Sequence, residues 1–127
     1  MENLRKNTLE FLSICDGAHQ LAKGLHWGAD KHSQHILMDE VDESVLEYQD
    51  KVAEIVMGMI GDKYKPGELK SLVSNARDIK GMLNELESDV LSYKSKIGDD
   101  KRMAALHNVI DDFLSDINKW KYLETLS

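Results

Sequence analysis

The fold is decided by residues 35–59, which read HILMDEVDESVLEYQDKVAEIVMGM. Apolar side chains recur in and around this stretch at alternating steps of three and four residues: Met38, Val41, Val45, Tyr48, Val52, Ile55 and Met59. This spacing gives a helix one apolar stripe, and Gly61 is the expected stop. We therefore predict an amphipathic helix that buries its apolar side against other helices.

The same stretch carries two pairs of candidate metal ligands, His35 with Asp39 and Asp50 with Glu54. The spacing of four within each pair places both side chains on one face, about a turn apart. Asp39 and Asp50 are separated by roughly 16 Å of helix, too far for one metal ion to bridge. Both pairs lie opposite the apolar stripe on a helical wheel, so they are predicted to face away from the core.

The two pairs are related by a simple symmetry, because 35 + 54 and 39 + 50 both equal 89. If two copies of the helix pack antiparallel about a two-fold axis near residues 44 and 45, His35 faces Glu54 of the other copy. Asp39 then faces Asp50 of the other copy. Leu46 lies on the same face near the axis, where it would seal the contact. The spacing predicts metal sites that are complete only in an oligomer.

Three further segments show the same apolar spacing: residues 4–25, 72–97 and 103–120. Gly28 and Gly98 are the expected stops of the first two, and Ser33 and Asp99 or Asp100 are the expected N-caps. Residues 61–71 break the pattern, and Pro66 suits the first position of a short extra helix. We predict an all-α protein with a single domain over residues 1–127, folded as a four-helix bundle.

Composition narrows the functional class. The net charge of −7 argues against a primary role in nucleic-acid binding, which needs a concentrated basic surface. No apolar run approaches the ~20 residues that span a bilayer. The N-terminal residues show no signal-peptide pattern, so we expect a cytoplasmic protein. The single cysteine, Cys15, falls at helical spacing and is expected to be a buried thiol.

Residues 26–54, HWGADKHSQHILMDEVDESVLEYQDKVAE, resemble the Dps family, the miniferritins of bacteria. That family has a His-Trp pair at the end of its first helix, and here the pair is His26-Trp27. Its second helix carries the two ligand pairs described above. Residues 117–127, INKWKYLETLS, look like the last helix of the family, with Trp120 at its usual tryptophan. The loop between His26 and His35 is shorter than is typical, and the lysine-rich tail by which some relatives bind DNA is absent.

The resemblance implies a ferritin-like subunit of a hollow cage, a homo-oligomer of twelve subunits. Such a cage takes up Fe(II), oxidises it with peroxide or oxygen at two-fold interfaces and stores Fe(III), which protects against oxidative damage. It implies a catalytic and iron-binding set of His26, His35 and Asp39 from one subunit with Asp50 and Glu54 from its mate. Glu54 is the natural bridging carboxylate. Trp27, beside the site, is the expected electron donor.

Carboxylates and imidazole suit Fe(II), and a mixed set with open positions leaves room for an oxidant. No Glu-x-x-His motif is present, which argues against a di-iron site within one bundle. Several alternatives stay open. His26 also suits the C-terminal end of a helix, where it would interact with the helix dipole. His32 either replaces His26 as a metal ligand or is a solvated loop residue. His19 and His107 are expected to be structural or exposed.

The competing interpretation of the whole chain is a helical-bundle structural or interaction protein with a degenerate metal site and no oxidase activity. In that case the acidic side of the central helix is only a solvated face. Compaction of DNA by the cage is disfavoured by the charge balance.

Overall fold

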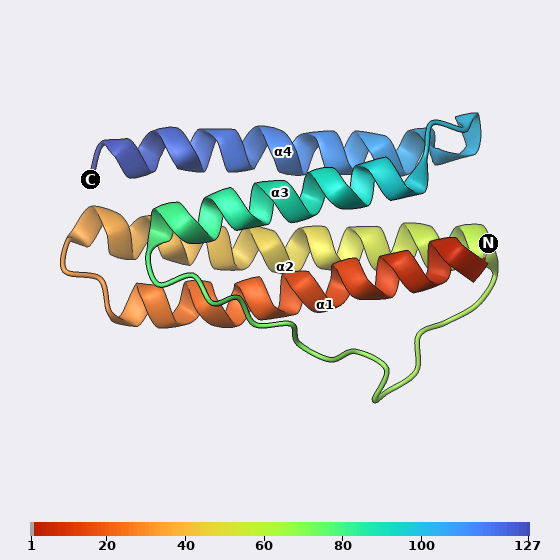
Figure 1. Ribbon diagram of the computed structural model, residues 1–127, viewed down its shortest axis with the longest axis horizontal. Helices are drawn as coiled ribbons and strands as arrows, with labels where there is room; N and C mark the ends of the chain where they lie inside the picture. The colour runs from red at the N-terminus through yellow and green to blue at the C-terminus, as the bar shows by residue number, and fades with distance from the viewer. Residues whose placement is uncertain (1) are drawn as a thin grey trace.

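The computed structural model describes residues 2–127, and the protein is all-helical there (Figure 1). Helix α1 spans Glu2–Trp27, α2 spans His32–Ile60, α3 spans Ile79–Ile97 and α4 spans Ala104–Thr125. A short 3-10 helix, η1, at Lys101–Met103 leads into α4, and no strand occurs in the described range. The predicted four-helix bundle is confirmed, and Met1 lies outside the described residues.

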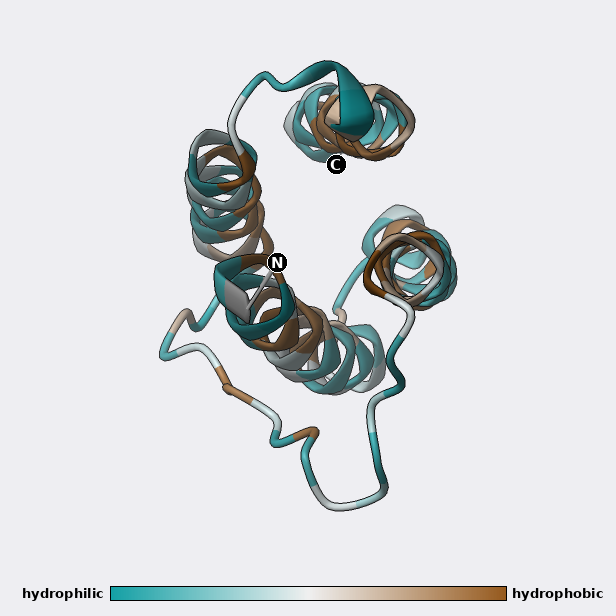
Figure 2. Ribbon diagram, turned by 90° about the vertical axis from the view of Figure 1, so that its right-hand side faces the viewer, coloured by the Kyte–Doolittle hydropathy of each residue, from teal (hydrophilic) through white to brown (hydrophobic). Residues whose placement is uncertain are grey.

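The helices are connected by two short turns and one long crossover. Residues 61–78, called here the crossover, leave the end of α2 and return along the bundle, so that α3 begins at the same end of the bundle as α2 (Figure 1). Helices α2 and α3 therefore run parallel, while α1 and α4 run the other way. Seen down the bundle, α1 and α4 each contact both α2 and α3 (Figure 2). All four neighbouring pairs are antiparallel.

The apolar stripes of the four helices meet along the bundle axis (Figure 2). Phe113 of α4 is fully buried; its ring stacks on Tyr48 at 4.4 Å and meets Trp120 edge-on at 6.4 Å between centroids. The Tyr48 hydroxyl donates to Asp116 Oδ2 at 2.5 Å. Cys15 is buried as expected, and burial raises the pKa of its thiol. Within residues 2–127, none of the helices combines the length and apolarity that a bilayer crossing demands.

Most helix ends follow the sequence signals. Gly61 adopts φ 67°, and its N–H donates to the Met57 carbonyl at 3.0 Å, as a left-handed C-terminal glycine does. Asp100 caps η1 by accepting from the Arg102 N–H at 2.9 Å. The prediction of Ser33 as N-cap is wrong, because α2 already begins at His32 and Lys31 holds the cap position without a side-chain bond.

The third helix begins later than predicted. Leu72 and Ala76 were expected inside it, but α3 begins at Ile79, where Asp78 caps the helix by accepting from the Gly81 N–H at 2.7 Å. The Leu72 N–H instead donates to the carbonyl of Ser13 in α1 at 3.0 Å. Pro66 lies in a turn and begins no helix. The crossover is thus held extended by its contacts with α1, which override the helical spacing.

Arg5 ties the start of the crossover to α1. Its guanidinium donates to both carboxylate oxygens of Glu68, at 2.9 and 3.0 Å, and to Asp62 Oδ2 at 3.0 Å. This pairing lowers the pKa of Glu68 to about 2. The crossover is therefore fixed at neutral pH by a bidentate ion pair near the start of α1.

Candidate metal centre

Two imidazoles meet at the corner between α1 and α2. His26 lies in the last turn of α1 and His35 in the first turn of α2, joined by the short loop 28–31. His26 Nδ1 donates to the carbonyl oxygen of His35 at 2.8 Å, and His35 Nδ1 donates to the carbonyl oxygen of His26 at 3.1 Å. The ring centroids are 3.7 Å apart with the planes at 25°. Both side chains are half-buried.

The hydrogen bonds define what these imidazoles can bind. A carbonyl oxygen only accepts, so each Nδ1 must carry the proton, and the neutral ring then has its lone pair on Nε2. A bond from Nδ1–H to a backbone carbonyl is the usual support of a histidine metal ligand, because it fixes both the tautomer and the ring orientation. His26 and His35, both in the set expected from the sequence, thus each keep an Nε2 lone pair that suits a metal ion.

The three carboxylates of the predicted set lie along the outward side of α2. Asp39, Asp50 and Glu54 are all exposed, as the helical wheel predicts. Across residues 2–127, no group of three or more His, Cys, Asp or Glu side chains is gathered closely enough to hold a metal ion. The structure therefore brings His26 and His35 together but leaves Asp50 and Glu54 apart from them within one chain. The residues present suit Fe(II) only if another copy completes the set.

Trp27 and His32 flank the pair. Trp27 is 73% exposed, with the Lys23 ammonium 6.0 Å from its ring centroid. His32 was expected in the loop but is the first residue of α2; it is exposed, and its ring centroid is 6.3 Å from that of His35. The ring that stacks directly on His35 belongs to His26. Of the two histidines left open by the sequence, His26 is the one that lies against His35.

A second polar pair, His19 with Asp42, was not singled out from the sequence. His19 Nδ1 hydrogen-bonds to Asp42 Oδ1, and both side chains are half-buried between α1 and α2. The signal was present: His19 is seven residues before His26, and Asp42 is seven residues after His35. Because α1 and α2 are antiparallel, a contact between His26 and His35 implies a second contact two turns away, between His19 and Asp42. His107, expected to be structural or exposed, bonds through Nε2 to the Gly98 carbonyl.

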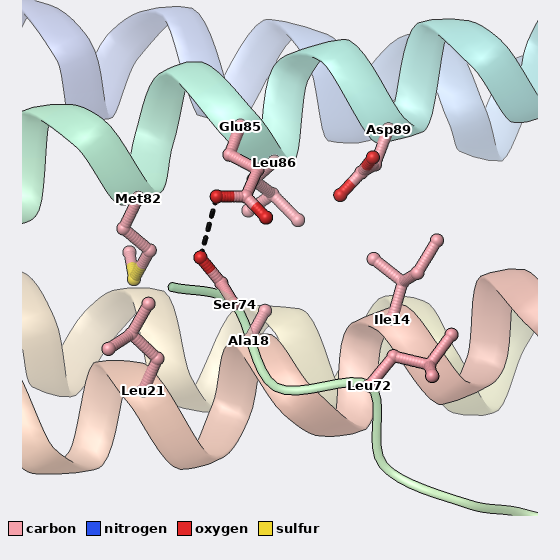
Figure 3. A pocket seen from close by; sticks show the side chains of 9 residues that line it. All are labelled: Ile14, Ala18, Leu21, Leu72, Ser74, Met82, Glu85, Leu86 and Asp89. Carbon is pink, nitrogen blue, oxygen red and sulfur yellow. Dashed lines mark hydrogen bonds between the residues drawn. The ribbon is translucent and has the colours of Figure 1, made fainter. Parts of the chain in front are cut away.

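A small cavity lies between α1, α3 and the crossover, away from the imidazoles (Figure 3). Leu72 and Met82 contribute to its apolar lining, and Ser74 donates to Glu85 Oε2 at its edge at 2.6 Å. Asp89 also lines it, and its burial, together with the charge of Glu85, raises the pKa of Asp89. The volume of about 20 Å³ accommodates little more than one water molecule, so this cavity does not suit an organic substrate.

Comparison of this chain with family models, with curated protein sequences and with solved structures found no match.

Proposed function

We propose that this protein is a Dps-like miniferritin. Its subunits bind Fe(II) between two-fold related copies, oxidise it with peroxide or oxygen, and store Fe(III) inside an oligomeric cage. The observation that carries the proposal is the His26–His35 pair, whose Nδ1 atoms are anchored on backbone carbonyls. This arrangement leaves the Nε2 lone pairs of both rings available to a metal ion at the turn between α1 and α2.

The exposed side of α2 supports the two-fold arrangement. Its ligand positions are symmetric about residues 44 and 45, and its carboxylates point to solvent. Leu46, near the axis, is 36% exposed and Ile36 is 53% exposed, so apolar surface accompanies the ligands. Packing two copies across this side would place Asp50 and Glu54 of the partner subunit beside His35 and Asp39. Each ion would then have imidazole and carboxylate ligands.

The roles of the residues follow from their chemistry. Imidazole and carboxylate together suit Fe(II), the substrate, and carboxylates stabilise the Fe(III) product more strongly because its charge is higher. Glu54 is suited to bridge two iron ions. Trp27 is suited to donate an electron to an oxidant that has accepted only one. Oxidation of each Fe(II) releases one electron, which passes to the peroxide or oxygen.

The connectivity of the bundle also supports the proposal. One long crossover between the second and third helices is the connection of ferritin-like folds, in contrast to the short loops of simple up-and-down bundles. Here residues 61–78 make that connection. A dodecameric cage in the cytoplasm, with no affinity for DNA or membranes, is part of the proposal.

The proposal predicts the effect of removing ligands on iron oxidation. His35→Ala and Asp50→Ala should each slow Fe(II) oxidation by at least about tenfold, since mutating even a residue that only supports a metal ligand lowers activity by this much. The rate is followed by the ultraviolet absorbance of the Fe(III) product. Helicity should not change, because Asp50 is exposed and His35 lies outside the apolar core.

His32→Ala and Asp112→Ala are the matched controls, since each removes a similar group from an exposed position outside the proposed set. Both should oxidise iron at the unaltered rate. Anaerobic titration with Fe(II) separates the proposal from its rival. Stoichiometric binding that is lost in His35→Ala supports the site, whereas no binding by the unaltered protein would favour a non-catalytic helical-bundle protein.

A further inference from the structure

The second half of the crossover is an extended segment that lies along α1 (Figure 1). At Leu72 both backbone groups face α1. The N–H donates to the Ser13 carbonyl at 3.0 Å, and the carbonyl oxygen would be 2.0 Å from a Cβ atom added at Gly17. In an extended chain the N–H and C=O of one residue point to the same side, and those of the next residue point to the opposite side. The backbone groups of Ser71 and Val73 therefore face away from α1.

This outward side of the crossover is unpaired. Leu69, two residues before Ser71, continues the alternation, and the N–H and C=O groups of Leu69, Ser71 and Val73 form no hydrogen bond with any residue in the range 2–127. A row of free N–H and C=O groups is a template to which another extended chain can add by main-chain hydrogen bonds. We call the outward-facing backbone of residues 69–73 the crossover edge.

The crossover edge is held in its extended form from both sides. Gln20 of α1 donates to the Ser71 hydroxyl oxygen at 2.7 Å, and the Ser71 hydroxyl donates to Asp16. Toward α3, the Ser74 hydroxyl donates to Glu85 Oε2 at 2.6 Å (Figure 3). A partner strand would thus meet a segment that is already ordered, so that less conformational entropy is lost on binding.

The charge around this edge is positive, although the chain as a whole has a net charge of −7. Four basic side chains of the crossover are exposed and form no ion pair within the described part of the chain: Lys63, Lys65, Lys70 and Arg77. The acidic residues of the same segment are engaged, since Asp62 and Glu68 pair with Arg5 and Asp78 caps α3. The free charge of the crossover therefore suits a negatively charged partner.

Aliphatic side chains flank the edge and narrow the class of partner. Leu69, Leu72 and Val73 are each roughly half exposed. A nucleic acid would meet the basic charge but would leave the strand edge and these side chains unused. A second copy paired edge to edge would set like charges opposite one another, which is unfavourable. An extended peptide with acidic and aliphatic residues satisfies the backbone, the aliphatic surface and the charge together.

We propose that the crossover edge binds an extended acidic peptide segment of a partner protein, which adds to residues 69–73 as a β-strand. Main-chain hydrogen bonds to Leu69, Ser71 and Val73 hold the peptide. Its aliphatic side chains cover the exposed leucines and valine, and its carboxylates face the free cations of the crossover. The inference does not depend on the iron chemistry, because none of these residues belongs to the proposed metal set.

The test is binding of a fluorescein-labelled peptide of alternating glutamate and valine, blocked at both ends, measured by fluorescence anisotropy with the whole chain. The peptide should bind saturably and should slow tryptic cleavage after Lys70, which it covers. The same peptide methylated on each backbone nitrogen keeps its charge and loses its donors. Its Kd should be at least about tenfold higher, because several main-chain hydrogen bonds are lost at once.

Two pairs of variants separate the strand edge from the charge. Val73→Pro removes an outward N–H and should raise the Kd of the peptide several-fold. Val73→Thr keeps that N–H and a branched side chain, and should leave the Kd unchanged. Lys70→Glu reverses a free charge beside the edge and should also weaken binding several-fold. Lys101→Glu makes the same change at an exposed, unpaired position of η1 and should have no effect. Helicity should be equal in all four.

Three results would overturn the proposal. Equal binding of the methylated peptide shows that charge alone attracts it and that no strand is added. No rise in anisotropy at the highest soluble protein concentration shows that the edge takes no acidic peptide. Self-association of the unaltered protein that the peptide reverses and Val73→Pro abolishes shows that a second copy occupies the edge. The iron oxidation assay with His35→Ala tests the proposed function separately, so failure of one proposal does not imply failure of the other.

Discussion

At the scale of single residues, Thr8 and Tyr93 illustrate how the bundle accommodates polar groups in its core. Thr8 of α1 is fully buried and Tyr93 of α3 is 3% exposed, and their hydroxyl oxygens are 2.7 Å apart. The ring of Phe11 stacks on that of Tyr93 at 4.3 Å between centroids. The Tyr93 hydroxyl is thus shut off from water, and burial raises its pKa. Its hydrogen bond with Thr8 compensates for lost hydration.

This pair predicts a non-additive double-mutant cycle. Thr8→Val keeps the shape but leaves the Tyr93 hydroxyl buried without a partner, so the free energy of unfolding should fall by about 1–3 kcal/mol. Adding Tyr93→Phe removes the orphaned hydroxyl and should restore much of that loss. Tyr93→Phe alone should cost less than Thr8→Val, because a helical threonine can bond to its own preceding turn. Urea unfolding measures all three; strict additivity would contradict the coupling.

The candidate site shows what spacing does and does not reveal about residues. The steps of four and the helical period were enough to predict that Asp39, Asp50 and Glu54 face solvent, because these depend only on helix geometry. The reciprocal bonds between His26 and His35 could not be predicted, since they depend on the path of the loop 28–31. The resemblance to miniferritins pointed to His26, but only the structure shows that Nδ1 is the ring atom held by a backbone carbonyl.

At the scale of elements, the approach of the crossover to α1 depends on one glycine. A Cβ atom added at Gly17 would lie 2.0 Å from the carbonyl oxygen of Leu72 and 2.4 Å from its carbon. Both atoms belong to backbone, which cannot rotate away as a side chain does. In addition, the Ser71 hydroxyl donates to Asp16, the residue directly before Gly17 in α1. The crossover therefore lies directly on α1 at the position where the helix has no side chain.

Gly17→Ala and Gly24→Ala should act in opposite directions. Both glycines lie within α1, but nothing lies within 4 Å of a Cβ at Gly24. Gly24→Ala should therefore raise the free energy of unfolding by about 0.5–1 kcal/mol through helix propensity. In Gly17→Ala, the clash with Leu72 should cancel this stabilisation and displace the crossover. Trypsin should then cleave after the exposed Lys70 several times faster than in Gly24→Ala. Equal cleavage in the two variants would show that the crossover does not need this contact.

The late start of α3 shows why this element was predicted only in part. Leu72, Ala76 and Ile79 follow helical steps, so the spacing alone extended the helix to residue 72. The contacts that keep residues 72–78 out of the helix come from α1, which is remote in sequence. The Ser13 carbonyl accepts a hydrogen bond from the Leu72 N–H, and Gly17 leaves space for the backbone of the crossover. Residues 74–78, Ser-Asn-Ala-Arg-Asp, held a local signal, since Ser74 and Asp78 both bond to backbone N–H groups ahead of them.

At the scale of the whole molecule, the bundle consists of two antiparallel pairs, α1 with α2 and α3 with α4, whose only covalent connection is the crossover (Figure 1). The contacts between the pairs, α1 on α3 and α2 on α4, lie in the common core. The crossover contributes little to it: Leu69, Leu72 and Val73 are each 44–56% exposed. The free energy that holds the pairs together therefore resides mainly in buried side chains of the helices and not in the covalent link.

This division predicts that a chain cut in the crossover stays folded. Brief trypsin treatment should cleave after Lys70 or Arg77, which are exposed, and spare Lys65, which precedes Pro66. The two fragments should separate on a denaturing gel yet elute together in native chromatography with unchanged helicity. Their thermal midpoint should now rise with protein concentration, because unfolding has become a dissociation. Fragments that separate under native conditions would show that the crossover, and not the core, holds the two pairs of helices together.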